Sequence, residues 1–223
     1  MILRRWLGSD GPTLSPPDFS AGDVEGFWRW FVRNADAATK LNSVSTKGGD
    51  VSPLVNALYD AVTRYADGLG ILVGIDVSGT NELIISGEGV TENFPAVVKL
   101  ARGAPVVAGW KFTSFKPRTS GSITGVGSIR IDPSDVLYSS SRREDELKLD
   151  IEVVLPHFVG QQEVDQRYLC YLLLDNVLGE YDVATAIGYI NVRVADVDER
   201  VAGRQLDDLA AEVDALGAQE SRN

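Results

Sequence analysis

Apolar and polar residues alternate most regularly between residues 147 and 155 of the chain. Successive side chains of a strand point to opposite faces, so this stretch predicts a strand with one apolar and one polar face. Between the apolar positions lie Lys148, Asp150 and Glu152. We therefore expect the face that carries Asp150 and Glu152 to meet solvent or a partner. The apolar positions are Leu147, Leu149, Ile151, Val153 and Leu155.

Other segments repeat apolar residues every three or four positions, which predicts helices. One of them is apolar on every side from Tyr168 to Leu174, so it should be buried between layers, with Leu172 and Leu173 at the centre of the fold. Short runs rich in β-branched residues predict strands. The predicted helices are residues 20–35, 52–65, 91–102 and 161–178, and the predicted strands are 71–77, 82–87, 109–115, 136–140, 147–155 and 187–194.

The order strand, strand, helix, strand occurs twice, over residues 71–116 and 136–194. Both closing strands begin with a glycine and an aromatic residue, Gly109-Trp110 and Gly188-Tyr189. The sequence therefore predicts an α+β fold in which N-terminal helices precede two ββαβ units. We expect mixed or antiparallel sheets with helices packed on them.

The two ends of the chain differ from this middle part. Residues 1–19 predict a loose leader because Pro16-Pro17 forbids a helix there, and 20–195 predict a single α+β domain. A charged C-terminal helix is expected over 196–216, followed by a tail over 217–223. Its narrow apolar stripe either docks on the body or pairs with another chain, which makes a homo-oligomer through this helix one alternative. The stripe is Leu206, Leu209, Val213 and Leu216.

Charge restricts the possible partners. The 223 residues carry a net charge of −11, with 21 Lys and Arg against 32 Asp and Glu, so the average field repels phosphate backbones and anionic lipid. We therefore expect no nucleic-acid and no membrane partner. A basic protein partner suits this charge, and a role in solubility explains it equally well. The single cysteine, Cys170, the lack of an export signal and the lack of a bilayer-length apolar run predict a cytoplasmic protein.

Few residues suggest chemistry. The only histidine, His157, has no recognisable catalytic partner, and Cys170 falls in the apolar helix, so no catalytic residue and no cofactor is predicted. Asp175, Glu180 and Asp182 cluster at a helix end and are weak candidates for holding a divalent ion. Gly179 beside them fits a helix terminus, which favours a structural reading of the cluster.

Three further segments have residue types that occur in binding sites. The run Gly125-Val126-Gly127 is too short for a nucleotide loop and predicts an ordinary loop. The segment Lys116-Pro117-Arg118 either binds an anion or protects the end of a strand. The run Phe27-Trp28-Arg29-Trp30-Phe31 cannot bury all its bulky side chains in one core, and Trp30 is the residue expected to face a partner.

Several motifs carry a family resemblance. They are FWRWF at 27–31, NFPAVVKL at 93–100, GWKF at 109–112, FKPR at 115–118, YLLLDNVLGEYDV at 171–183 and IGYI at 187–190. Together they resemble a family of bacterial cytoplasmic proteins of unknown function, over about residues 24–194. The resemblance implies a stand-alone bacterial protein with this fold, and it implies no activity, cofactor or catalytic residue.

Taken together, these features favour a non-enzymatic binding or interaction protein that uses Asp150, Glu152 and Trp30 toward a basic protein partner. The alternative is a small-molecule-binding or hydrolytic enzyme that uses the carboxylates of Asp175 and its neighbours, with or without a divalent metal.

Overall fold

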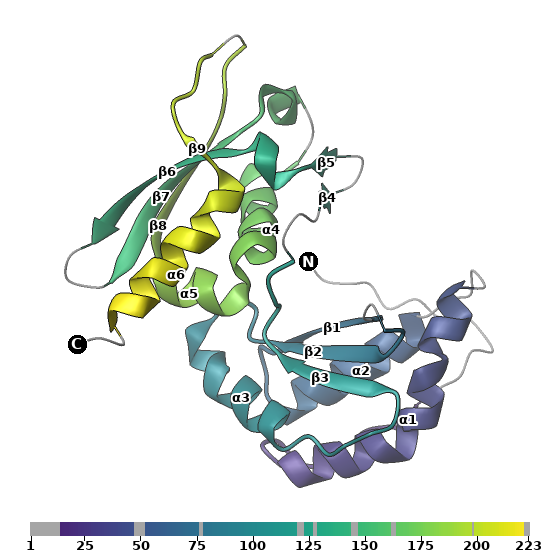
Figure 1. Cartoon of the computed structure of the whole chain (residues 1–223). Coiled ribbons are helices and arrows are strands. Elements are labelled where there is room, and N and C mark those ends of the chain that lie inside the picture. Colours follow the sequence, from purple (N-terminus) through teal and green to yellow (C-terminus); the bar gives the residue numbers. More distant parts are fainter. Residues whose placement is uncertain are drawn as a thin grey trace. The chain divides into compact units, whose positions relative to one another are not determined.

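The computed structural model describes residues 14–46, 52–75, 78–119, 123–126, 129–143, 147–161, 164–197 and 199–220. The chain divides into two compact units, a first unit of residues 1–115 and a second unit of residues 116–223. Figure 1 shows both as α+β structures, each with helices beside a sheet. Within the described ranges, no helix is sufficiently long and apolar to cross a bilayer. The prediction of one domain over 20–195 stays a prediction.

The first unit contains the three-stranded sheet β1-β2-β3. β1 pairs with β2 antiparallel, and β3 pairs with β2 parallel after a crossover through α3. The short connection between the first two strands explains the antiparallel pair, because only a parallel pair needs a helical crossover. The elements are α1 (Val24–Thr46), α2 (Ser52–Tyr65), β1 (Gly70–Ile75), β2 (Asn81–Ser86), α3 (Phe94–Arg102) and β3 (Trp110–Ser114).

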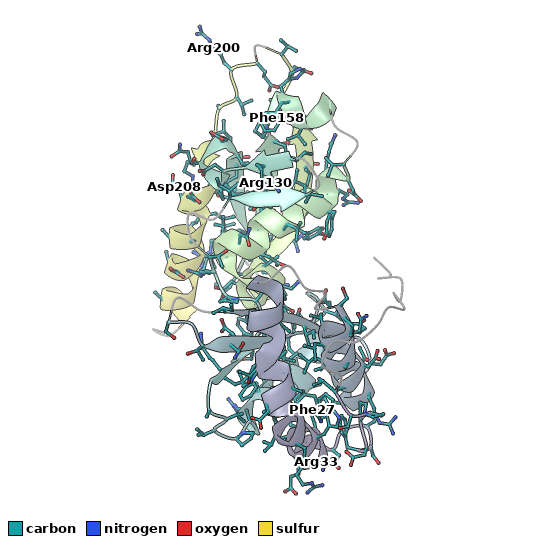
Figure 2. All side chains as sticks on the ribbon, turned by 90° about the vertical axis from the view of Figure 1, so that its right-hand side faces the viewer. Phe27, Arg33, Arg130, Phe158, Arg200 and Asp208 are labelled. Atoms are coloured by element: carbon teal, nitrogen blue, oxygen red, sulfur yellow. The ribbon has the colours of Figure 1, made fainter. Side chains whose placement is uncertain are left out.

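Aromatic rings from α1 and β3 form much of the core of the first unit. Trp28 lies edge-on to Phe112 with ring centroids 4.6 Å apart, and Phe31 meets Trp110 at 5.1 Å. Such edge-to-face contacts add to the free energy of burying the rings. Figure 2 labels Phe27, which is fully buried in this unit, and Arg33, which projects from its surface.

Trp30 does not face a partner, so that prediction is wrong. Its side chain is 0% exposed, and its indole N–H donates to the carbonyl oxygen of Ser15 at 2.8 Å. The ring also lies edge-on to Phe19, with centroids 6.2 Å apart. The bulky α1 side chains are buried on two sides because residues 15–19 of the predicted loose leader cover the side that the sheet leaves open.

The second unit contains a four-stranded sheet in the order β8-β7-β6-β9 and a separate hairpin, β4-β5. β6 pairs with β7 antiparallel, and β7 pairs with β8 parallel after α4 and α5. The elements are β4 (Thr124–Val126), β5 (Ile129–Ile131), β6 (Leu137–Arg143), β7 (Lys148–Leu155), α4 (Gln166–Leu178), α5 (Glu180–Ala186), β8 (Ile187–Val194), β9 (Arg204–Gln205) and α6 (Leu209–Glu220).

Both units therefore contain the same motif. In each, an antiparallel pair is followed by a helix and by a third strand parallel to the second, in the orders β1-β2-β3 and β6-β7-β8. The predicted α+β class with two ββαβ units is confirmed. The Gly-aromatic entries into the two closing strands are not equivalent, because Trp110 is buried whereas Tyr189 is 60% exposed.

The core of the second unit lies between its sheet and α4 and α6, which Figure 1 shows beside one another. Leu173 is fully buried there, as the all-round apolar helix predicted. The stripe from Leu206 to Leu216 packs into the same core, so it docks on its own unit, which was one of the two alternatives. Its apolar surface is not available to pair with another chain.

Several boundaries differ from the predictions. The predicted helix 161–178 begins only at Gln166, since residues 157–161 form a 3-10 helix, and a further helix, α5, follows Gly179. The C-terminal helix begins at Leu209 instead of residue 196 and continues to Glu220, into the predicted tail. Gly125 and Val126, predicted as part of a loop, lie in a strand because β4 pairs with β5, and Gly127 lies outside the described residues.

Candidate functional site

The acidic cluster at the end of α4 is held by basic residues of its own unit. The Glu180 side chain is 1% exposed, and its Oε2 accepts a hydrogen bond from the backbone N–H of Lys116 at 3.1 Å. The N–H of Glu180 donates in return to the Lys116 carbonyl oxygen at 2.9 Å. The Lys116 ammonium lies 3.3 Å from Asp175. The carboxylates of Glu180 and Asp175 therefore bind Lys116, at the start of the second unit.

Arg118 forms an ion pair with Asp182, the third carboxylate of the cluster. Its guanidinium lies 2.5 Å from Asp182 and 2.8 Å from Asp214 of α6, and its Nε donates to the Leu178 carbonyl oxygen at 2.9 Å. Hydrogen bonding to Arg118 lowers the pKa of Asp214. The basic segment predicted as an anion site or as edge protection instead ties α4, α5 and α6 together.

These contacts bear on whether the acidic cluster can hold a metal ion. Asp175, Glu180 and Asp182 were the candidates for a divalent ion, and each faces a cation or a backbone N–H. Among the described residues, no three His, Cys, Asp or Glu side chains come together as a metal site would require. The geometry supports the structural reading of these three carboxylates.

The sheet of the second unit presents one polar face. Its residues alternate with the core residues of the same strands, and none of them is buried. Cross-strand register brings them together, because Ser139 pairs with Glu152, Ser141 with Asp150, and Glu152 with Asn191. We call this surface the open face; it comprises Ser139, Ser141 and Arg143 of β6, Asp150 and Glu152 of β7, and Tyr189, Asn191 and Arg193 of β8.

Asp150 is fixed by two neighbouring strands. It accepts a hydrogen bond from the backbone N–H of Tyr189 at 2.6 Å and lies 2.9 Å from the Arg143 guanidinium. Both interactions lower the pKa of Asp150, and the hydrogen bond from the Tyr189 N–H has the larger effect. A Cβ at Gly188 would lie 2.5 Å from the Asp150 carboxylate, so glycine leaves the space that this carboxylate occupies.

Glu152 is held in a similar way. Its Oε1 accepts from the Asn191 amide at 2.9 Å, and its Oε2 lies 3.6 Å from Arg193, which also pairs with Glu199 at 3.0 Å. A shallow hollow of about 250 Å³ lies over these side chains and offers hydroxyl, amide and carboxylate groups to a ligand. The hollow is lined by Ser139, Ser140, Ser141, Asp150, Ile151, Glu152, Tyr189 and Asn191.

The open face is polar but not a simple row of carboxylates. The strand alternation correctly placed Asp150 and Glu152 side by side, yet Arg143 and Arg193 lie against them. The sequence missed these arginines because each lies on a different strand, and only the sheet register brings them near β7. A partner that binds this face therefore contacts carboxylates that are already paired with arginine side chains.

Uncompensated acidic charge lies elsewhere in the second unit. Partial desolvation raises the pKa of Asp207, whose side chain is exposed, and the negative charges of Asp132 and Asp208 raise it further. Among the described residues, none of the three forms an ion pair within 4 Å with a basic side chain. Figure 2 shows Asp208 at the surface. In the sequence, only the adjacent pair Asp207-Asp208 indicates this acidic patch. The fold brings Asp132 near Asp207.

The only histidine and the only cysteine lie on different elements of the second unit. His157 begins the 3-10 helix after β7, with its Nδ1 3.2 Å from the Ala195 carbonyl oxygen. Cys170 is fully buried in α4, and burial raises the pKa of its thiol to about 12. The thiol is therefore protonated at neutral pH and is a poor nucleophile.

Comparisons of the chain with protein-family models, with curated proteins and with solved structures find no match in any of the three. The resemblance to a bacterial family of unknown function stays a prediction. What the open face can do follows from its own geometry and charge.

Proposed function

We propose that this chain is a non-enzymatic cytoplasmic binding protein that holds a basic protein partner on the open face of its second unit. The observation that carries the proposal is the hollow over this face, where Ser139, Ser141, Asn191 and the two bridged carboxylates stand within reach of one ligand. Hydroxyl and amide groups both donate and accept, so such a surface can hydrogen-bond the main chain and basic side chains of a partner.

The net charge of the whole second unit also favours a basic partner. The second unit has 20 Asp and Glu against 11 Lys and Arg, a net charge of −9, whereas the first has 12 against 10, a net charge of −2. A field of one sign steers a partner of the other sign and raises the association rate. The open face then supplies the specific contacts.

The alternative, an enzyme built on the carboxylates of Asp175, Glu180 and Asp182, has less support. A general acid or base must reach a substrate proton, and a metal site must leave its ligands free to coordinate. Glu180 is buried against the backbone of Lys116, and Asp182 is bridged to Arg118.

The test removes charge from the open face without changing side-chain size. The variant Asp150→Asn/Glu152→Gln keeps the oxygen that accepts from Tyr189, so the fold should persist. Tagged wild type and variant are used to capture partners from host lysate at about 0.05 M and about 0.5 M salt, since the Debye length is about 10 Å at 0.1 M. We expect basic proteins to bind the wild type at low salt, to weaken at high salt and to be lost by the variant.

A matched control carries the same loss of charge on the first unit. The variant Asp60→Asn/Asp67→Asn changes two exposed carboxylates outside the open face and should retain the partners of the wild type. The proposal fails when the open-face variant and the control capture the same proteins equally. Turnover of any substrate that is abolished by Asp182→Asn in a folded protein would favour the enzyme instead.

A further inference from the structure

Residues 14–19 of the first unit lie along α1 and belong to no helix or strand. We call this segment the strap; its sequence is LSPPDF. Pro16 and Pro17 have no backbone N–H and a fixed φ, so the strap cannot extend a sheet and loses little conformational entropy when it docks. It is therefore held on α1 by individual contacts, as a bound peptide is.

Phe19 is the buried anchor of the strap. Its side chain is 5% exposed, and its ring lies edge-on to Phe27 at 5.7 Å and to Trp30 at 6.2 Å between centroids. A Cβ at Gly26 would lie 2.7 Å from the Cβ of Phe19, so glycine leaves the space that Phe19 occupies. One side of α1 thus forms a pocket for a single aromatic side chain of an extended segment.

Polar groups beside this pocket bind mainly the backbone of the strap. The indole N–H of Trp30 donates to the Ser15 carbonyl oxygen at 2.8 Å, and Nε of Arg64 on α2 donates to the Phe19 carbonyl oxygen at 2.6 Å. The Asn34 side-chain oxygen accepts from the Ser15 N–H at 2.9 Å and from its hydroxyl at 3.0 Å. Three of these four bonds use backbone groups, which other extended segments also offer.

Charge adds selectivity to the groove. The Arg33 guanidinium donates to both carboxylate oxygens of Asp18, at 2.5 and 2.7 Å. The side chains of this ion pair are 52% and 62% exposed, and exposed pairs contribute little to stability. Figure 2 shows Arg33 at the surface of the unit. The groove therefore favours a carboxylate directly before the aromatic anchor, without depending on that pair for its fold.

We propose that this groove is a recognition site for an extended segment of a partner protein, and that the strap occupies it as an intramolecular ligand. The partner segment has the chemistry of the strap that it displaces: proline, then a carboxylate, then an aromatic residue. Docking of proline-rich segments in aromatic-lined grooves is a recurring mode of peptide recognition. Trp30 is covered in both states, first by the strap and then by the partner. The site lies in the first unit and does not depend on the open face.

The strap also explains how the groove stays soluble. An exposed groove lined by Phe27 and Trp30 would favour non-specific association. A tethered ligand covers it, and the apparent affinity of any competing segment falls by the fraction of chains in which the groove is open. Changes that weaken the strap should therefore strengthen the binding of an added peptide.

This inverse relationship is the test. The probe is a labelled peptide of residues 14–21 with blocked ends, and fluorescence anisotropy measures its binding to the full chain. Phe19→Ala in the chain removes the anchor of the strap and should lower the dissociation constant of the peptide at least about tenfold relative to wild type. Asp18→Ala removes only the exposed ion pair, so it should retain the fold and lower the constant about threefold.

Two arginines of α1 provide matched controls on the Phe19→Ala background. Arg33→Glu places a carboxylate opposite Asp18 of the peptide and should abolish the gain in affinity, whereas a peptide with Asp18→Lys should bind this variant again. Arg29→Glu makes the same charge change at a side chain that pairs with Glu25 and should leave binding unchanged. Circular dichroism checks that each variant is folded, and Asp18→Ala decides the test when Phe19→Ala fails to fold.

A peptide that binds neither strap variant, or that binds them no more tightly than wild type, overturns the proposal. So does binding that is insensitive to Arg33→Glu. A wild-type dimer that Phe19→Ala dissociates would assign the groove to the strap of a second copy and would also overturn a partner segment as its occupant. Neither readout involves the open face, so failure here is distinguishable from failure of the proposed function.

Discussion

Glu180 and Lys116 exchange two hydrogen bonds: the Glu180 N–H donates to the Lys116 carbonyl oxygen at 2.9 Å, and the Lys116 N–H donates to the Glu180 carboxylate at 3.1 Å. The carboxylate is 1% exposed, so it is a buried acceptor of a backbone donor. This pair joins the start of the second unit to α5, which lies 64 residues later along the chain.

Glu180→Ala should lower the free energy of unfolding by about 1.5–3 kcal/mol, because it leaves the partly buried Lys116 N–H without this acceptor. Glu180→Gln keeps an oxygen at this position and should cost less. The midpoint of a urea titration measures both. All four tryptophans lie within residues 1–115, so unfolding of the second unit is followed by far-ultraviolet circular dichroism. Equal midpoints for wild type and both variants would contradict this role.

Gly179 should not tolerate a side chain. Its φ of 79° and ψ of 153° lie in a region that is essentially restricted to glycine, and a Cβ there would lie 3.1 Å from the Lys116 carbonyl oxygen. We expect Gly179→Ala to destabilise the chain by about 1–3 kcal/mol. Gly217→Ala is the control, because a Cβ at Gly217 meets no atom within 4 Å and alanine favours helix α6. A Gly179→Ala protein as stable as the control would show that alanine adopts this backbone conformation without strain.

Leu173→Ala should cost about 2–5 kcal/mol of a total stability of about 5–15 kcal/mol, since Leu173 is fully buried between the sheet and the helices of the second unit. Tyr171→Ala, two residues earlier on the same helix, removes a side chain that is 47% exposed and should cost much less. The urea midpoints of the two variants provide the comparison. An unchanged midpoint for Leu173→Ala would show that α4 is peripheral.

Two carboxylates of the second unit should respond to pH in opposite directions. Hydrogen bonds from Tyr189 and Arg143 lower the pKa of Asp150, so its stabilising contribution is present above the unfolded pKa of about 4 and is lost as pH falls through the lower folded value. Partial desolvation and the charges of Asp132 and Asp208 raise the pKa of the exposed Asp207. The ionised Asp207 therefore destabilises the fold once the pH rises through its folded pKa.

The corresponding variants are Asp150→Asn and Asp207→Asn. At neutral pH we expect Asp150→Asn to lower the unfolding midpoint and Asp207→Asn to raise it, and both differences should shrink as the pH falls below about 4. Urea titrations at a series of pH values give the two curves. A midpoint for Asp207→Asn at neutral pH that is equal to or below that of wild type would contradict the repulsion.

Gly188→Ala should disturb the open face more than the fold. A Cβ at this position would lie 2.5 Å from the Asp150 carboxylate, which must then move away from the Tyr189 N–H. We expect the pKa of Asp150 to rise toward its ordinary value, as measured by NMR titration of the carboxyl carbon. An unchanged pKa in Gly188→Ala would show that Asp150 is not constrained by this glycine.

Local pattern was sufficient for most elements of this chain. The alternation from Leu147 to Leu155 predicted β7, which begins at Lys148, and the all-round apolar run around Leu173 predicted the buried helix α4. The order of elements predicted two ββαβ units, because a hairpin and a helical crossover follow from the lengths of the connecting segments. The helix α5 and the strands β4, β5 and β9 were missed, since each is short and depends on contacts with other segments.

By itself, the sequence determined the α+β class, the repeated ββαβ order and the position of Asp150 and Glu152 on a polar strand face, because those properties depend on residues close together in the chain. Only the tertiary structure decided that Asp175, Glu180 and Asp182 are matched by Lys116 and Arg118, that Trp30 is buried beneath Ser15 and Phe19, and that arginines neutralise the open face. Charge pairing and burial depend on which distant segments the fold brings into contact. A local pattern of apolar and polar residues contains no record of those contacts.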